Sequence, residues 1–161
     1  MFVRSFADVP VPFAEAERRL LASSTNWITG LAREAEDGGE RLLVEVGFPI
    51  EGERRVKKEV EVEIGAPHRT DSATRLPLNW RATGPRSLFP SLEADLEVAA
   101  LGPERTQVSV SATYRPPLGA FGRRLDRTLL HRVAEATIKD FVDRVSEALS
   151  EARPTETVAQ A

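Results

Sequence analysis

Five consecutive segments in the middle of the chain alternate apolar and polar residues, and a single long amphipathic segment follows them. A period of two residues predicts β-strands that bury one face. The turns between the segments, such as Gly84-Pro85 and Gly102-Pro103, are only a few residues long. Parallel crossovers need a dozen or more residues, so we predict an antiparallel meander. The predicted strands are 41–48, 56–64, 75–82, 92–100 and 107–114.

The long amphipathic segment, from about 120 to 152, has the spacing of an α-helix. Apolar residues recur in it every three to five positions, which is typical of a helix with one buried face. The most extended apolar surface available to that helix is the inner face of the predicted sheet, so we predict a two-layer α+β architecture. The expected stripe is Phe121, Leu125, Leu129, Val133, Ala136, Phe141, Val145 and Leu149, widened by Ile138 and Val142.

The N-terminal part adds one strand and two short helices. Residues 2–9 read as a strand that ends at Pro10 and joins the sheet at an edge. A helix is predicted from about 13 to 22 and a second from 27 to about 35, after an N-cap in the segment 23–26. The predicted sheet therefore has about six to seven strands.

The length of 161 residues suits one domain. We assign it to residues 1–152, and the small, polar segment 153–161 reads as a disordered tail. The sequence has no apolar run long enough to cross a membrane and no signal-peptide pattern at its N-terminus. We therefore expect a cytoplasmic protein without a transmembrane segment.

Composition removes several classes of chemistry. The chain has no cysteine, which excludes disulfides, zinc–thiolate sites and cysteine nucleophiles. It has two histidines, and neither belongs to a metal-ligand motif, so we predict no metal and no cofactor. The net charge is −3 and no basic block stands out, which argues against binding to nucleic acid. The oligomeric state is left open.

Three local stretches stand out beside the order of elements. They are Pro77-Leu78-Asn79-Trp80-Arg81-Ala82, Leu88-Phe89-Pro90-Ser91-Leu92-Glu93-Ala94-Asp95-Leu96 and Thr113-Tyr114-Arg115-Pro116-Pro117-Leu118-Gly119. Together with the order of elements, they resemble the START-like (SRPBCC) superfamily. They are similar to bacterial members of the polyketide cyclase/dehydrase and lipid-transport type. The resemblance implies the helix-grip fold, a curled antiparallel sheet wrapped on a long C-terminal helix. It also implies a cavity between the two, roofed by the short helices, that holds a hydrophobic molecule.

Three aromatic residues are candidate ligand contacts. Trp80 and Tyr114 fall on the inward face of their strands, where each forms either a pocket wall or ordinary core. Trp27 begins the second short helix, and it either closes the mouth of the pocket or plugs the gap between helices and sheet.

The other three candidates are Lys58, Phe89 and Phe121. Lys58 lands among inward-facing valines, which suggests an anchor for a ligand carboxylate. The alternative is a lysine at a strand bulge whose charged tip reaches water. Phe89 belongs to the second family-like stretch, and Phe121 begins the helical stripe.

No catalytic residue is assigned from the sequence. His68 and Asp71 lie in a segment, 65–72, that we interpret as a polar connector, because no motif ties a nucleophile to them. Three functions stay open. The first is a module that binds or carries a lipid or polyketide-like molecule. The second is an enzyme of the cyclase or dehydrase type acting in the same cavity. The third is an interaction protein whose cavity is filled.

Overall fold

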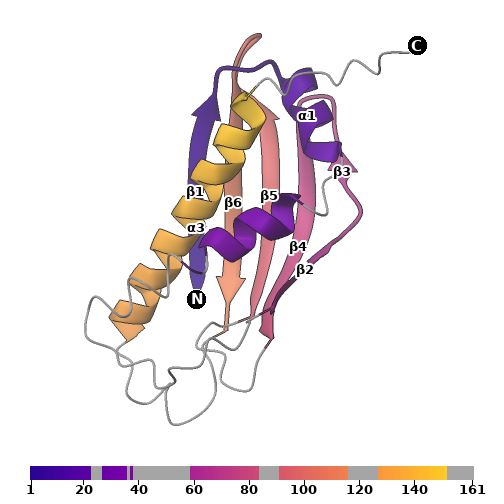
Figure 1. Cartoon of the computed structure of the whole chain (residues 1–161). Helices are drawn as coiled ribbons and strands as arrows, with labels where there is room; N and C mark the ends of the chain where they lie inside the picture. Colours follow the sequence, from indigo (N-terminus) through magenta and orange to yellow (C-terminus); the bar gives the residue numbers. More distant parts are fainter. Residues whose placement is uncertain (23–26, 36, 38–58, 84–90, 116–126, 152–161) are drawn as a thin grey trace.

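The computed structural model describes residues 1–22, 27–35, 37, 59–83, 91–115 and 127–151. Within these residues, six strands form one antiparallel sheet in the order β1-β6-β5-β4-β2, with β3 paired to β4 (Figure 1). The strands are β1 (Phe2–Val9), β2 (Glu59–Ile64), β3 (His68–Arg69), β4 (Ala73–Thr83), β5 (Leu92–Ala100) and β6 (Thr106–Tyr114).

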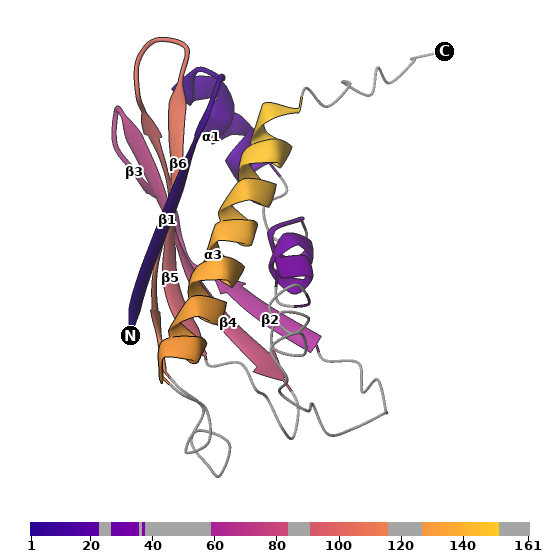
Figure 2. The same cartoon turned by 90° about the vertical axis from the view of Figure 1, so that its left-hand side faces the viewer.

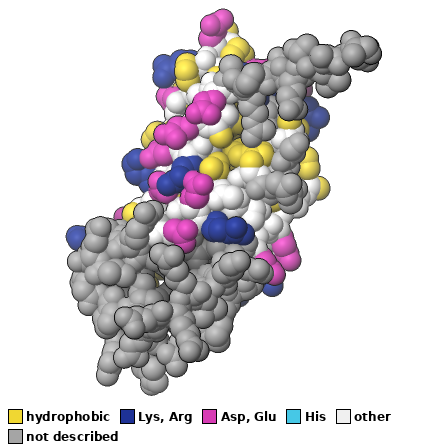
Figure 3. All heavy atoms as spheres, viewed as in Figure 1, with side chains coloured by type: hydrophobic (Ala, Val, Ile, Leu, Met, Phe, Trp, Pro, Cys, Tyr) yellow, Lys and Arg dark blue, Asp and Glu magenta, His cyan; other side chains and the backbone are white. Residues whose placement is uncertain are grey.

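The helices all lie on one face of the sheet, as Figure 2 shows. They are α1 (Phe13–Leu21), the helical residues 27–35, and α3 (Arg127–Ser150). The side chains between sheet and helices form a continuous core in which Leu96, Val108 and Phe141 have no exposed surface. On its solvent side α3 carries ion pairs one turn apart, such as Lys139 with Asp143. Figure 3 shows charged side chains on this face of the molecule.

The two-layer α+β architecture is confirmed, as is the antiparallel pairing. The strand at 2–9 pairs with β6 at the edge of the sheet, as expected. The predicted strand 41–48, the helix start at 120–126 and the tail 153–161 lie outside the described residues.

Two expectations were wrong in detail. His68 and Arg69 are not part of a structureless connector but form the short strand β3, because their backbone pairs with Arg75 and Thr74. In α3, Ala136 is exposed, whereas Thr137 is only 4% exposed. A stripe drawn from apolar residues alone misses a buried threonine.

Polar contacts fix the helices on the sheet. Glu17 of α1 accepts hydrogen bonds from Arg69 (2.8 Å) and Thr74 (2.5 Å), which join it to β3 and β4. Residues 27–35 are joined to α3 by an ion pair between Glu34 and Arg144.

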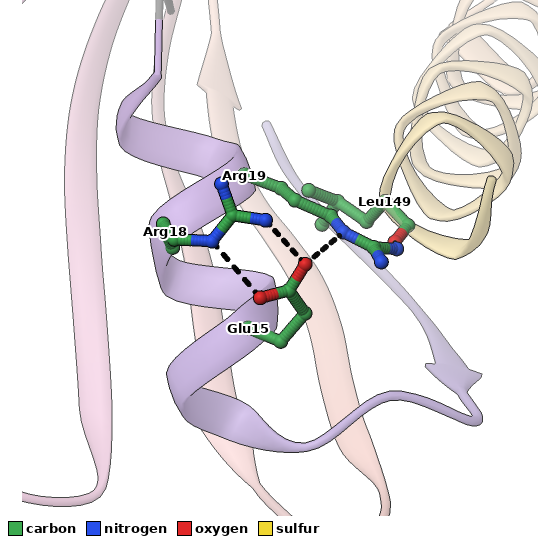
Figure 4. Close-up of polar contacts among 4 residues, drawn as sticks. All are labelled: Glu15, Arg18, Arg19 and Leu149. Atoms are coloured by element: carbon green, nitrogen blue, oxygen red, sulfur yellow. Dashed lines mark hydrogen bonds and ion pairs between the residues drawn. The ribbon is translucent and has the colours of Figure 1, made fainter. Parts of the chain in front are cut away.

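The opposite side of α1 contacts the end of α3. Figure 4 shows Glu15 between Arg18 and Arg19, with Arg19 extending to the backbone of Leu149. The two guanidinium groups, first that of Arg18 and then that of Arg19, lower the pKa of Glu15 to about 2. Arg19 also donates to the Leu149 carbonyl, near the C-terminal end of α3, where a positive charge is favourable.

Pro77 lies inside the central strand β4 without breaking the sheet. Its carbonyl accepts a hydrogen bond from the Gly65 amide (2.8 Å), so its nitrogen also points toward β2 rather than β5. Along β4, the residues that pair with β2 end at Leu78 and those that pair with β3 begin at Arg75, so Pro77 falls between the two sets of pairs. The missing N–H therefore costs no bond between β4 and β5.

Candidate functional site

A row of inward-facing side chains crosses four strands near the end of the sheet where β4 and β6 finish. The register places Tyr114 opposite Leu92, Leu92 opposite Trp80, and Trp80 opposite Val62. Directly opposed residues in antiparallel strands share a face of the sheet. Tyr114 is 1% exposed and Trp80 2% exposed, so both belong to the interior.

The helix α3 covers this row. The rings of Trp80 and Phe141 meet edge to face, with centroids 5.4 Å apart and an angle of 68° between the planes. Thr137 precedes Phe141 by four residues, so its side chain lies on the same side of the helix. The hydroxyl of Thr137 is therefore one turn from the contact between Phe141 and Trp80.

Among the described residues, three buried side-chain polar atoms have no hydrogen-bond partner. They are the Thr137 hydroxyl and Nδ1 of His131, both on α3, and the indole Nε1 of Trp27. Other hydroxyls of α3 behave differently: those of Ser146 and Ser150 donate to the carbonyls four residues earlier, at 2.8 and 2.7 Å. A buried polar group without a partner costs about 1–3 kcal/mol. The Thr137 hydroxyl and the Trp27 N–H thus have hydrogen-bonding capacity that the described residues do not use.

The phenol of Tyr114 is a third polar group of this interior. It donates to the thioether of Met1 at 3.2 Å, and a thioether is a weak acceptor. Burial, and secondly the negative charge of Glu135, raise the pKa of Tyr114 above its usual value of 10.0. The phenol is therefore protonated at neutral pH and keeps its proton for donation.

The structure brings together some of the predicted site residues. Trp80 and Tyr114 lie in one row of the inner face. Trp27 is partly buried and packs against the core, with its indole N–H covered. Lys58, Phe89 and Phe121 lie outside the described residues. Thr137 was missed from the sequence. The signal that could have found it is its position, four residues before Phe141 and four after Val133, between two residues of the stripe.

Two grooves lie on the opposite, outer face of the sheet. The larger, of about 670 Å³, is lined by polar residues such as Asn79 and Asp95 and by apolar residues such as Phe2 and Pro77. The smaller, of about 260 Å³, is lined by Arg4, Arg75 and polar neighbours on β5 and β6. The outer face is therefore charged, while the candidate site on the inner face is apolar with isolated polar atoms.

Within the described ranges, no three histidines, cysteines or carboxylates come together in a way that could hold a metal ion. In the same ranges no helix has the length and apolar character needed to cross a membrane.

The arrangement of the chain matches known structures across nearly its whole length. A conserved protein from Geobacillus kaustophilus superposes with a TM-score of 0.52 at 14% identity, over 91% of this chain and 93% of that one. Three features of this chain define its fold: the order of the strands in the sheet, the short helices after β1 and the long helix α3 after the last strand. The chain has the helix-grip fold. The fold that the START-like resemblance implied is thus confirmed.

Other helix-grip structures align at lower scores. The Zhui aromatase/cyclase from Streptomyces sp. R1128 aligns at TM-score 0.46 and 13% identity, over 92% of this chain and 93% of that one. Ara h 8.0201 aligns at 0.46 and 15% identity, over 93% and 94%. No family model matches the sequence, and no curated protein does. The match to the Geobacillus kaustophilus protein shows the fold alone, so a function has to be argued from the site itself.

Proposed function

We propose that this helix-grip protein binds a hydrophobic small molecule that carries at least one hydrogen-bonding group, between the inner sheet face and α3. The observation that carries the proposal is the unpartnered hydroxyl of Thr137, 4% exposed, one turn from the aromatic contact of Trp80 with Phe141. The unpartnered N–H of Trp27 and the weakly bonded phenol of Tyr114 support it. An apolar wall with a few polar groups is the usual composition of a small-molecule site.

The first test is native mass spectrometry of the purified full-length chain, with an organic extract of the same sample. We expect a co-purifying hydrophobic mass, and we expect the extract to displace 1-anilinonaphthalene-8-sulfonate from the protein. No bound mass and no saturable binding of that probe would contradict the proposal and favour the interaction protein with a filled interior.

The variant Thr137→Val separates a binding role from a structural one. It removes the unpartnered hydroxyl and keeps the shape of the side chain, so the ligand-free protein should become more stable by about 1 kcal/mol. Affinity for the co-purified molecule should fall by about tenfold, the size of one hydrogen bond. The matched control is Ser150→Ala, whose hydroxyl already bonds to Ser146. Unchanged affinity in Thr137→Val would exclude Thr137 from the site.

The three other residues predicted from the sequence to contact the ligand are kept as candidate ligand-binding residues. Lys58 is proposed as the anchor of a ligand carboxylate, and Phe89 and Phe121 as apolar contacts. Each is tested by an alanine variant in the same displacement assay. A variant that binds the extract as tightly as the native chain removes that residue from the site.

A second function, catalysis of the cyclase or dehydrase type, is favoured by Tyr114 alone. Its buried phenol stays protonated and can donate to a substrate carbonyl, which stabilises negative charge as that carbonyl is attacked. The test is incubation with a linear poly-β-ketone, followed by mass spectrometry for loss of one water. Tyr114→Phe should lose turnover and still bind the probe. Full turnover in that variant would exclude this role for Tyr114.

A further inference from the structure

Within the described part of the chain, strand β1 has one free edge, which carries exposed aromatic and charged side chains. It stands at the end of the sheet order and, within the described ranges, pairs only with β6. Met1 and Tyr114 exchange both backbone hydrogen bonds, at 2.8 and 2.9 Å. In an antiparallel pair such bonds recur at every second residue. The backbone groups of Phe2, Arg4, Phe6 and Asp8 therefore point to the free edge.

The side chains of the same four residues lie on the outer face of the sheet. All four are exposed, and the rings of Phe2 and Phe6 are unusually so for large apolar groups, at 60% and 65%. Natural edge strands are usually protected by a proline, a bulge or charged side chains. β1 has no proline and no bulge, and its two charged residues, Arg4 and Asp8, are opposite in sign. This edge is suited to pairing with another strand.

We propose that a second copy of this chain pairs with the free edge, antiparallel, with the twofold axis at Phe6. In this register Arg4 faces Asp8 of the partner subunit, and Asp8 faces Arg4 of the partner subunit. Phe6 faces Phe6 of the partner subunit. The two opposite charges on one strand face, spaced four residues apart around an exposed aromatic ring, make the edge complementary to itself.

The neighbouring registers lack this complementarity. A shift of two residues sets a charge opposite an aromatic ring: in one direction Arg4 faces Phe6 of the partner subunit, and in the other Asp8 faces Phe6 of the partner subunit. A shift of four residues sets Arg4 opposite Arg4 of the partner subunit, or Asp8 opposite Asp8 of the partner subunit, where like charges repel. Within the monomer, Asp8 lies 3.3 Å from Arg105 in an exposed pair, and a carboxylate can accept from both arginines. Charge therefore selects the register centred on Phe6.

Disulfide trapping tests the register directly, because the native chain has no cysteine. Residues that directly oppose each other in a hydrogen-bonded pair have Cα atoms about 5.5 Å apart, within the range of a disulfide. The full-length F6C variant should oxidise to a covalent dimer at least about tenfold faster than F2C. F2C is the matched control, since Phe2 is equally exposed on the same face of β1. Equal rates for the two variants would overturn the proposal.

A charge exchange provides a second, independent readout by sedimentation velocity over a concentration series. The native chain should show a concentration-dependent dimer. R4D alone and D8R alone should each weaken it by about tenfold, because each creates two like-charge contacts. The double variant R4D/D8R should restore it. R105A controls for the ion pair within the monomer and should leave the dimer intact. A native chain that stays monomeric throughout, or a double variant no better than the single ones, would overturn the proposal.

Discussion

The indole ring of Trp80 in β4 meets the ring of Phe141 in α3 edge to face, with the centroids 5.4 Å apart. Both residues are almost fully buried. The contact joins the sheet to the long helix next to the unpartnered hydroxyl of Thr137, so it holds the two walls of the proposed site at a fixed spacing.

Phe141→Ala should be among the most destabilising single substitutions in the described part of the chain. It removes a fully buried ring and leaves a cavity that the packed sheet cannot close, which costs about 3–5 kcal/mol. The loss in the free energy of unfolding is measured by urea denaturation monitored by circular dichroism. Leu101→Ala is the control, because Leu101 is 48% exposed and its loss should change stability by less than about 0.5 kcal/mol. A loss at Phe141 no larger than at Leu101 would contradict the packing described above.

The carboxylate of Glu17 makes stability sensitive to acid. Its hydrogen bonds from Arg69 and then Thr74 lower the pKa of Glu17 below its usual 4.5. The unfolded chain therefore takes up this proton first as the pH falls. The contribution of Glu17 is complete above pH 4.5 and is lost below it, as the pH approaches the folded-state pKa.

Glu17→Gln should consequently be less stable than the native chain by about 1 kcal/mol at pH 7. The difference should shrink as the pH is lowered through 4.5, because Glu17 becomes neutral in the native chain too. Thermal unfolding between pH 7 and pH 3 measures the stability difference between the two proteins and its change with pH. Glu93→Gln is the control, since Glu93 and Arg115 form an exposed pair at 3.5 Å. A pH-independent difference would show that the Glu17 charge is unimportant.

Tyr114 is the only tyrosine of the chain, so ultraviolet absorbance reports its titration without interference from another phenol. We expect a midpoint above 10.0 in the folded protein and close to 10.0 in denaturant. Because the folded pKa is raised, the associated stability is complete below pH 10 and is lost as the pH rises through the folded value. Tyr114→Phe supplies the baseline. A folded midpoint at or below 10.0 would mean that the phenol is accessible to water.

Two glycines should respond to alanine in opposite directions. Gly102 has φ of 137°, a conformation that alanine adopts only under strain, so Gly102→Ala should destabilise by about 1 kcal/mol or more. Gly30 lies within the helical residues 27–35, and an added Cβ would meet no atom within 4 Å. Gly30→Ala should stabilise by up to about 1 kcal/mol. Urea midpoints measured side by side test the pair, and a stabilising Gly102→Ala would contradict the turn geometry.

Local patterns in the sequence were enough to predict the elements and their inward faces. The strand at 2–9, the helices at 13–22 and 27–35, and the inward side chains of Trp80 and Tyr114 all follow from periodicity. Periodicity is a property of neighbouring residues, so it can be recognised without knowing which distant residues a segment contacts. It erred where a polar residue took a buried position, as at Thr137, and where a strand of two residues is too short to show alternation, as at His68.

The sequence by itself thus determined the two-layer α+β architecture, through alternation, short turns and one long stripe. Only the tertiary structure decided which groups meet. It set Phe141 against Trp80 and turned Phe2 and Phe6 outward on β1. It also left the Thr137 hydroxyl and the Trp27 N–H without a hydrogen-bond partner among the described residues. These outcomes depend on the pairing of β1 with β6 and on the position of α3 over the sheet. Both bring together residues far apart in the chain, which no local pattern encodes.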